Sequence, residues 1–451
     1  MMNWENLREK VVEKKYPDEE EFDRLWKKYK EVSEYIEGEY GIETFFAGSA
    51  GRGTCVSGDR DIDIFLMFPE DLERQELENC GLDIGEETFR HFDGDYDVEY
   101  AEHPYTKGEI EGFEIEIVPC YDTDPEEIQS AVDRSPHHAR WVKENLDREQ
   151  KEDVVLLKSF LKAEGLYGSS LKNRGFSGYL CEILIYEYGS LEKLVEEAEQ
   201  WREKTILDPE MHHKKDLPEK LEEKFSNDSL VVIDPVDPER NVAAVLTTEN
   251  YAKFIHRCWK FDQKPGVNYF EREETEVDKF TLQKEVEQRG DFIVLEFDAI
   301  DEPEDIVYPQ MRKAMKRLQN ILENHDFRIY ESGFHVGGKI RVFFELGSSL
   351  PGVRYQRGPK VFHGPEHLEE FTSKYENTFI RDERIYAKVE REYTEAKELL
   401  KDFLDEEPGE LEKKGVPGNV ADGMQGFRMT DPLVEDEEWL KFLTRKLEVE
   451  P

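Results

Sequence analysis

The stretch that decides the fold lies near the N-terminus and reads GSAGRGT at residues 48–54, followed by DRDIDIF at residues 59–65. The residues on either side, 43–47 and 61–68, are apolar and aromatic enough to form two short strands. A glycine-rich turn between strands leaves backbone N–H groups free to bind an anion, and a helix that begins there directs them at it. The stretch therefore predicts a phosphate-binding turn.

Four side chains in this stretch have the chemistry of a nucleotide site. Ser49 offers a hydroxyl, and Arg52 offers a planar set of hydrogen-bond donors. Asp61 and Asp63 alternate along a strand, so both face the same side while the isoleucines beside them point into the core. Two carboxylates on one face are the ligands that magnesium bound to a nucleotide requires.

A third carboxylate should come from another strand, because two-metal phosphoryl chemistry needs one more ligand. Residues 113–118 alternate glutamate with isoleucine, which places Glu114 and Glu116 on one face of a strand. An isolated Asp-x-Asp in so acidic a chain is usually solvated surface. Its combination with the turn, with eleven residues between Ser49 and Asp61, is more specific.

The charge of the chain is unusual. Its 451 residues carry 61 basic and 105 acidic side chains, which gives a net charge of −44. Such a field repels nucleic acid, but it also keeps a protein soluble in concentrated salt, where charges are screened. The acidic residues are spread along the whole chain, which favours a surface adapted to brine. The net charge therefore does not exclude a nucleic-acid partner.

The length predicts more than one domain. Helical periodicity covers residues 4–15 and 18–40, and returns from about 135 to 201 and from 241 to 261, with an exposed connection expected at 207–228. From residue 291 the order strand, helix, strand, strand indicates a small sheet with helices on one face. We expect an α+β fold in three domains, at residues 1–150, 151–285 and 286–451.

The sequence also predicts where the protein is located and the state of its cysteines. No apolar stretch is long enough to span a membrane and no N-terminal signal is visible, so we expect a soluble, cytoplasmic protein without a membrane partner. The five cysteines are odd in number and scattered, which predicts reduced thiols rather than disulfides or a zinc site.

The phosphate turn followed by two alternating aspartates resembles the nucleotidyltransferase superfamily of DNA polymerase beta. Several downstream blocks are similar to those of the archaeal CCA-adding enzymes, the class I tRNA nucleotidyltransferases. These blocks are YAEHPY at 100–105, IVPCY at 117–121, SAVDRSP at 130–136, RGFSGYLCE at 174–182, and DPVD at 234–237 with RNVAA at 240–244.

The resemblance implies a polymerase beta-like palm, a helical central domain that binds nucleotide and tRNA, and an α/β tail that binds the tRNA acceptor arm. It implies template-independent addition and repair of the 3′-terminal CCA of tRNA from CTP and ATP, with release of pyrophosphate. Two Mg²⁺ ions would serve the reaction, one at the attacking hydroxyl and one at the leaving group. A homodimer is also what the family suggests.

Site residues transfer from the family by position. Ser49 and Arg52 would bind the triphosphate, and Asp61 and Asp63 would bind metal. The third metal ligand falls on Glu116, where the family more often has aspartate.

Glu114 is the alternative third ligand. Beyond the first domain, His138 matches a histidine that contacts the nucleotide. Lys158 and Tyr167 match positions that hold the triphosphate and the sugar. Arg240 matches an arginine used to recognise the incoming base.

The tRNA would be held by shape, through backbone and 2′-hydroxyl contacts. Basic side chains are few along the tail, with candidates on a helix (Arg312, Lys313, Lys316, Arg317) and in a following loop (Arg354, Arg357, Lys360). We therefore expect tRNA affinity to depend only weakly on salt, and a steep loss with added potassium chloride would contradict this.

Other readings share the same motifs. Poly(A) polymerases and enzymes that adenylylate small molecules use the same catalytic core, and only a CCA-adding enzyme stops after three additions. A non-catalytic RNA-binding descendant is a further alternative because of Glu116. In that case magnesium should not tighten nucleotide binding.

Overall fold

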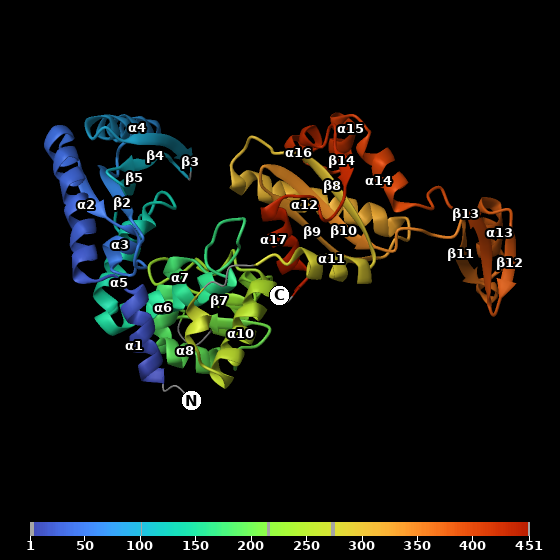
Figure 1. Ribbon diagram of the computed structural model, residues 1–451, viewed down its shortest axis with the longest axis horizontal. Helices are drawn as coiled ribbons and strands as arrows, with labels where there is room; N and C mark the ends of the chain where they lie inside the picture. The colour runs from blue at the N-terminus through green and yellow to red at the C-terminus, as the bar shows by residue number, and fades with distance from the viewer. Residues whose placement is uncertain (1–3, 101, 214–216, 272–275, 450–451) are drawn as a thin grey trace. The chain divides into compact units, whose positions relative to one another are not determined.

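The computed structural model forms two compact units, residues 1–273 and 274–451 (Figure 1). The structure describes residues 4–100, 102–213, 217–271 and 276–449. Both units combine helices with sheets, so the predicted α+β class is confirmed. The first unit holds the predicted palm domain and most of the predicted central domain, whose last residues fall in the second unit. The division into three domains at 150 and 285 stays a prediction.

A mixed sheet forms the core of the N-terminal part. In the described residues its strand order is β1-β2-β5-β4-β3, and only the β2–β5 pair is parallel. The strands are β1 (Glu43–Phe46), β2 (Asp61–Pro69), β3 (Asp95–Tyr100), β4 (Pro104–Ile110) and β5 (Phe113–Asp122). Helices α2 (Glu19–Tyr40) and α4 (Arg74–His91) cover one face, where alternate apolar side chains of β2 and β5 are buried. The other face of the sheet carries the acidic side chains.

Helix α4 and strand β4 were not predicted. Two glycines interrupt the sequence of α4, and glycine normally weakens a helix. Both glycines are needed for close packing, because a Cβ at Gly81 would lie 2.6 Å from Pro119 and one at Gly85 would lie 2.1 Å from Oγ1 of Thr106. The tertiary contact therefore overrides the local propensity.

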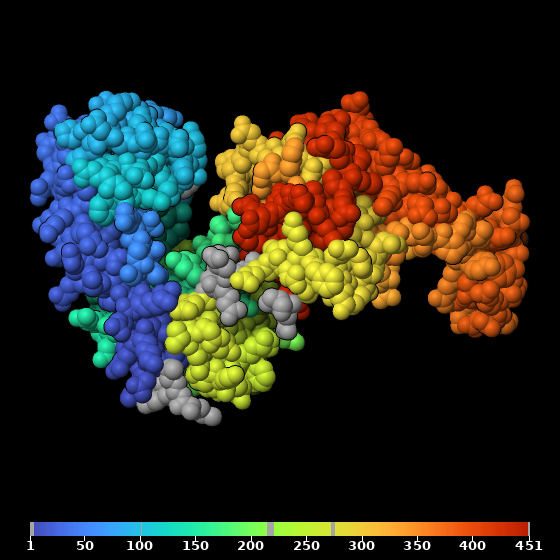
Figure 2. All heavy atoms as spheres, in the orientation of Figure 1, coloured from blue at the N-terminus to red at the C-terminus, as the bar shows by residue number. Residues whose placement is uncertain are grey.

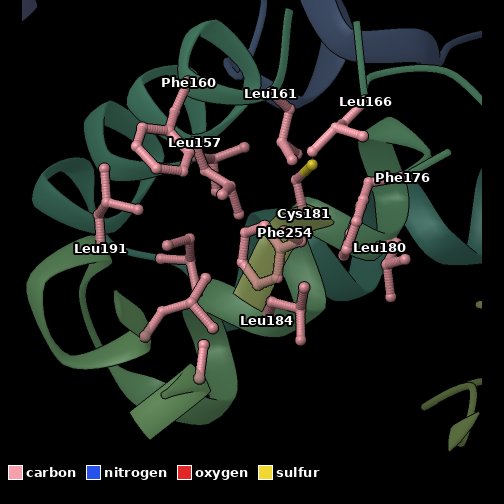
Figure 3. Packing of buried hydrophobic residues seen from close by; sticks show 14 of the residues in the cluster. Leu157, Phe160, Leu161, Leu166, Phe176, Leu180, Cys181, Leu184, Leu191 and Phe254 are labelled. Atoms are coloured by element: carbon pink, nitrogen blue, oxygen red, sulfur yellow. The ribbon is translucent and has the colours of Figure 1, made fainter. Parts of the chain in front are cut away.

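A second core lies among the helices of the first unit. Leu157 and Phe160 of α6, Leu184 of α7, Leu191 of α8 and Phe254 of α10 interdigitate there (Figure 3). The helices around this core are α1 (Trp4–Lys15), α5 (Arg134–Asn145), α6 (Arg148–Glu164), α7 (Gly178–Tyr188), α8 (Leu191–Ala198), α10 (Thr248–Gln263) and the 3₁₀ helix η1 (Val267–Phe270). Figure 2 shows α1 and α2, in dark blue, as a continuous part of the surface of this unit.

The segment 207–228 is more structured than the exposed connection we predicted. It begins at the end of β6 (Thr205–Leu207), which pairs in parallel with β7 (Leu230–Val232), and it contains α9 (Leu217–Lys224). Leu221 of α9 is buried against Val231 and Ile233. Strands of three residues are too short to show a sequence pattern.

The second unit contains a four-stranded antiparallel sheet with the order β14-β8-β10-β9 in the described residues. The strands are β8 (Asp291–Asp298), β9 (Ile329–Val336), β10 (Lys339–Leu346) and β14 (Arg428–Thr430). The expectation of helices on one face is wrong, since helices pack on both. One face carries α12 (Glu304–Asn324), α14 (Ala396–Leu404), α15 (Pro408–Lys413) and α16 (Gly418–Gly423), and the other carries α11 (Lys279–Gln288) and α17 (Glu437–Lys446).

A separate three-stranded sheet, in the order β11-β13-β12, packs against α13. The elements are β11 (Val353–Lys360), the 3₁₀ turn η2 (Val361–His363), α13 (Pro365–Lys374), β12 (Thr378–Arg381) and β13 (Arg384–Glu390). Arg354, Arg357 and Lys360 thus lie on a strand and not in the predicted loop. The pairing that makes this segment a strand, Val353 opposite Glu390, joins residues distant in sequence.

All five cysteines are free, as predicted, and four of them are buried. Among the described helices, none is both long and apolar enough to cross a membrane.

Candidate functional site

Four carboxylates lie on one face of strands β2 and β5. The parallel register places Asp61 opposite Glu114 and Asp63 opposite Glu116. The isoleucines between them, Ile62, Ile64, Ile115 and Ile117, are fully buried on the other face. The alternation expected from the sequence therefore produces an acidic face beside an apolar core.

The phosphate turn is fitted closely around Asp63. It forms the short helix α3 (Gly48–Arg52), and Gly48 at its start has a φ of +59°. A Cβ at Gly48 would lie 1.5 Å from Oδ2 of Asp63, so no other residue fits there. The Ala47 N–H also donates to the Asp63 carbonyl oxygen at 3.1 Å. The position of the turn relative to the Asp63 carboxylate is therefore fixed.

Burial, together with repulsion between carboxylates, raises the pKa values of Asp61 and Asp63. Burial, followed by the charges of Glu116 and Asp61, raises the pKa of Asp63 to about 7 against the opposing effect of Arg52. Burial, Asp59 and Glu114 raise the pKa of Asp61. A divalent cation at this face would relieve the repulsion.

The third carboxylate is partly neutralised within the protein. Glu116 is half-buried and accepts a hydrogen bond from Lys107 Nζ at 2.7 Å, whereas Glu114 is exposed. As the side chains stand, no three His, Cys, Asp or Glu residues in the described part of the chain converge on one point. The donors nevertheless fit magnesium by type, since Asp61, Asp63 and Glu116 supply hard oxygens on one face.

A buried glutamate on α7, Glu182, binds Arg52 and Thr54, and Thr54 in turn binds Lys158. Arg52 Nε donates to Glu182 Oε1 at 2.8 Å, and the Thr54 hydroxyl donates to the same oxygen. Lys158 Nζ donates to the Thr54 carbonyl at 2.7 Å. Only 1% of Lys158 is exposed, and burial lowers the pKa of its ammonium.

Tyr167 closes this cluster. A Cβ at Gly178, the first residue of α7, would lie 3.2 Å from the Tyr167 hydroxyl and 3.5 Å from Lys158 Nζ, so both groups approach the start of this helix. Burial raises the pKa of the Tyr167 hydroxyl.

A second cluster surrounds the fully buried Asp234. Its Oδ2 contacts His138 Nε2 at 2.9 Å and accepts a hydrogen bond from Arg240 Nη1 at 2.7 Å, and the Tyr179 hydroxyl donates to Oδ1 at 3.1 Å. The His138 ring stacks on Tyr179 at 3.9 Å. Burial opposes the charge of Asp234, but the bonds from His138 and Arg240 lower its pKa overall. Burial also lowers the pKa of His138.

The structure thus groups most of the predicted residues. Asp61, Asp63 and Glu116 share the sheet face, while Ser49 lies in α3 beside Arg52. Arg52, Lys158 and Tyr167 form one cluster, and His138 and Arg240 form the other. Helix α7 carries a member of each cluster, because Tyr179 donates to Asp234 and Glu182 accepts from Arg52.

Five members of the site were given no role from the sequence. They are Thr54, Lys107, Tyr179, Glu182 and Asp234. Glu182 and Asp234 lie in the segments 174–182 and 234–237, which resemble those of the archaeal CCA-adding enzymes. This resemblance was the signal that could have identified them. Lys107 lies on β4, whose strand was not predicted.

Family models match three consecutive parts of the chain. A nucleotidyltransferase domain matches residues 19–138, the second domain of tRNA nucleotidyltransferases matches 152–271, and the C-terminal domain of CCA-adding enzymes matches 289–426. These matches agree with the polymerase beta-like, helical and C-terminal parts expected from the resemblance.

Curated relatives match across most of the length. The CCA-adding enzyme of Methanocaldococcus jannaschii is 37% identical over 427 residues, covering 92% of this chain and 93% of the relative. That of Archaeoglobus fulgidus is 36% identical, covering 89% and 90%. That of Halobacterium salinarum is 39% identical, covering 75% and 72%. The chain therefore belongs to the family of CCA-adding enzymes.

Proposed function

We propose that this enzyme adds C, C and A to the 3′ end of tRNA from CTP and ATP and releases pyrophosphate at each step. The observation that supports this most is the acidic face of Asp61, Asp63 and Glu116 beside the turn of α3. In the reaction the terminal ribose hydroxyl attacks the α-phosphorus in line, and the bond to the β-phosphate oxygen breaks. No protein nucleophile is needed.

Asp61, Asp63 and Glu116 would hold Mg²⁺, which when bound would acidify the attacking hydroxyl and neutralise charge on the triphosphate. Glu116 is favoured over Glu114 as the third ligand, because it lies directly opposite Asp63 and is the first charge that raises its pKa. In this structure Lys107 donates a hydrogen bond to Glu116, and it would release Glu116 when Mg²⁺ binds.

The turn would bind the triphosphate. The backbone N–H groups at the start of α3, the Ser49 hydroxyl and the terminal nitrogens of Arg52 offer donors on the side of Asp63. Tyr167 and Lys158 would hold the sugar and the triphosphate, as the resemblance implies. The Lys158 ammonium is bound to Thr54, so in this conformation it acts on the triphosphate through the turn.

His138 and Arg240 would contact the incoming nucleotide, with Arg240 at the base. The Arg240 side chain is 38% exposed while its Nη1 is held by Asp234, so the remainder of the guanidinium can meet a base edge. Asp234 would orient both side chains by accepting their hydrogen bonds.

The second unit would bind the acceptor arm of tRNA. Arg354, Arg357 and Arg391 line a cavity of about 760 Å³, where Arg354 and Arg391 pair with Asp326. Arg357 and the remaining donors of the two paired arginines would contact a phosphate backbone. A homodimer and a cytoplasmic location complete the proposal.

The test is incorporation of α-labelled CTP and ATP, singly and together, into a tRNA transcript that lacks its last three nucleotides. The reactions contain magnesium and either low or molar potassium chloride. We expect two C additions from CTP alone and one A once ATP is supplied. Unlimited addition of A would instead identify a poly(A) polymerase, and no incorporation at any salt concentration would contradict the proposal.

A further inference from the structure

Glu182 lies on α7 where groups proposed to bind the triphosphate meet. Its side chain is 0% exposed, and its Oε1 atom accepts hydrogen bonds from both Arg52 and Thr54. Its Oε2 atom has no hydrogen-bond partner within the described residues. A charge that is buried with one oxygen unpaired opposes folding, so stability alone does not explain this residue.

Glu182 is the counter-charge to two buried cations. It contacts Arg52 directly, and it reaches Lys158 through Thr54, whose carbonyl and hydroxyl oxygens both accept hydrogen bonds from Lys158 Nζ, at 2.7 and 3.3 Å. Among the charges near Lys158, Glu182 contributes most to keeping the ammonium protonated against burial. Glu182 therefore holds Arg52 directly, while Thr54 stands between it and Lys158.

The contact with Arg52 uses only the Nε atom. In the part of the chain that the structure describes, its terminal nitrogens Nη1 and Nη2 make no hydrogen bond. Asp63 is the next carboxylate that acts on Arg52. Without the charge of Glu182, Asp63 would still attract the guanidinium, and an ion pair there would occupy a carboxylate proposed to bind metal.

We infer that Glu182 is a positioning residue of the nucleotide site, which holds Arg52 by Nε so that its terminal nitrogens stay available to a triphosphate and away from Asp63. This inference rests on the proposed nucleotidyl transfer and adds a residue that need not touch the nucleotide itself. Because a guanidinium binds phosphate by its planar fork, losing its orientation should weaken triphosphate binding.

The experiment measures equilibrium binding of CTP in the presence of Mg²⁺ and without tRNA. Glu182→Gln keeps the size and removes the charge, and we expect CTP to bind at least about tenfold more weakly. The matched control is Asp153→Asn, which neutralises another buried carboxylate, one that pairs with Arg8 at 2.7 Å and accepts the Leu191 N–H at 2.9 Å. The control should bind CTP within about twofold of wild type.

A double-mutant cycle tests whether Glu182 acts through Arg52. In an Arg52→Ala background, Glu182→Gln should change CTP affinity by less than about twofold. An equal loss in both backgrounds would overturn the inference, and so would wild-type affinity in the single variant.

A second variant covers the case in which Glu182→Gln does not fold. Glu182→Asp keeps the counter-charge but is one methylene shorter, so it cannot reach Arg52 and Thr54 equally well. We expect a loss of about threefold in CTP affinity, smaller than for glutamine. Wild-type affinity of Glu182→Asp would overturn the inference.

Incorporation into tRNA separates this result from the proposed function. If wild type adds CCA and Glu182→Gln binds CTP normally, only the positioning role fails. If wild type does not add CCA but Glu182→Gln loses CTP binding through Arg52, the positioning role stands and the proposed reaction fails.

Discussion

Asp63 on the sheet and Asp234 among the helices are both carboxylates of the site, but their surroundings are opposite. Asp63 faces Glu116 and Asp61, and its pKa is raised to about 7. Asp234 accepts hydrogen bonds from His138, Tyr179 and Arg240, which lower its pKa. Arg52 and Lys107 balance the charge of the first group only in part, whereas the second group has its cations built in, so the proposed external cation belongs at the sheet.

The largest expected effect comes from Asp63→Asn. The proposed metal site loses a central ligand, so incorporation of CTP should fall by about a thousandfold or more. The fold should survive. Because the folded state raises the pKa of Asp63, its charge costs stability progressively as the pH rises from about 4 to about 7.

The melting temperature of Asp63→Asn at pH 8, without divalent metal, should therefore equal or exceed that of wild type. Labelled incorporation and thermal unfolding measure the two effects. A variant that is both active and less stable would break the contrast between the two carboxylates.

The choice of third ligand gives the next largest effect. Glu116→Gln should lower kcat by about a hundredfold, since its carboxylate lies opposite Asp63. Glu114→Gln is the matched control on the same strand and should change kcat by less than about threefold. Single-turnover incorporation measures both, and a larger loss in Glu114→Gln would reassign the ligand.

Asp234→Asn tests the balanced carboxylate. At pH 7 it should lower the free energy of unfolding by about 2–3 kcal/mol, because buried charge-assisted hydrogen bonds are lost. The lowered pKa means that Asp234 stabilises the fold above pH 4 and loses this effect as the pH falls further. Urea unfolding of wild type and variant should therefore converge in acid.

The control for this prediction is Asp237→Asn in the same loop. Asp237 pairs with Arg134 at 3.0 Å near the surface, and its removal should cost less than about 1 kcal/mol. Equal losses of unfolding free energy in the two variants would show that the buried hydrogen bonds of Asp234 stabilise the fold no more than the Asp237–Arg134 ion pair does.

The smallest effect concerns Lys107, which supplies positive charge to the sheet face. Lys107→Met should free Glu116 for metal and lower the Mg²⁺ concentration for half-maximal activity by about two- to threefold. Lys28→Met is the control, because Lys28 pairs with Glu31 and Glu111 instead. A magnesium titration of activity measures both, and a raised requirement would mean that Lys107 assists the loaded site.

Local pattern predicted which acidic residues share a face within each strand, Asp61 with Asp63 and Glu114 with Glu116, because strand geometry depends only on neighbouring residues. The parallel pairing that brings β2 and β5 together joins residues distant in sequence and was not predicted. Helix α4 was missed because Gly81 and Gly85 serve a tertiary contact that the sequence does not display. Helix α17 covers the face of the second sheet on which no helix was expected, and this contact also joins residues distant in sequence.

The buried carboxylates were missed for a related reason. Arg52 and Glu182 are separated by 130 residues, and His138 and Asp234 by 96. A carboxylate in such a pair looks like any other acidic residue until the fold brings its partner close. The burial of the Lys158 ammonium against Thr54 could not be predicted from the sequence for the same reason.

The most direct test of the contrast is binding of Mn²⁺ in the presence of CTP, followed by electron paramagnetic resonance. Wild type, Asp61→Asn and the buried control Asp153→Asn are compared. We predict that wild type and Asp153→Asn bind Mn²⁺ with similar affinity and that Asp61→Asn loses at least about tenfold. Undiminished Mn²⁺ binding by Asp61→Asn would contradict the assignment of a cation site to this face of the sheet.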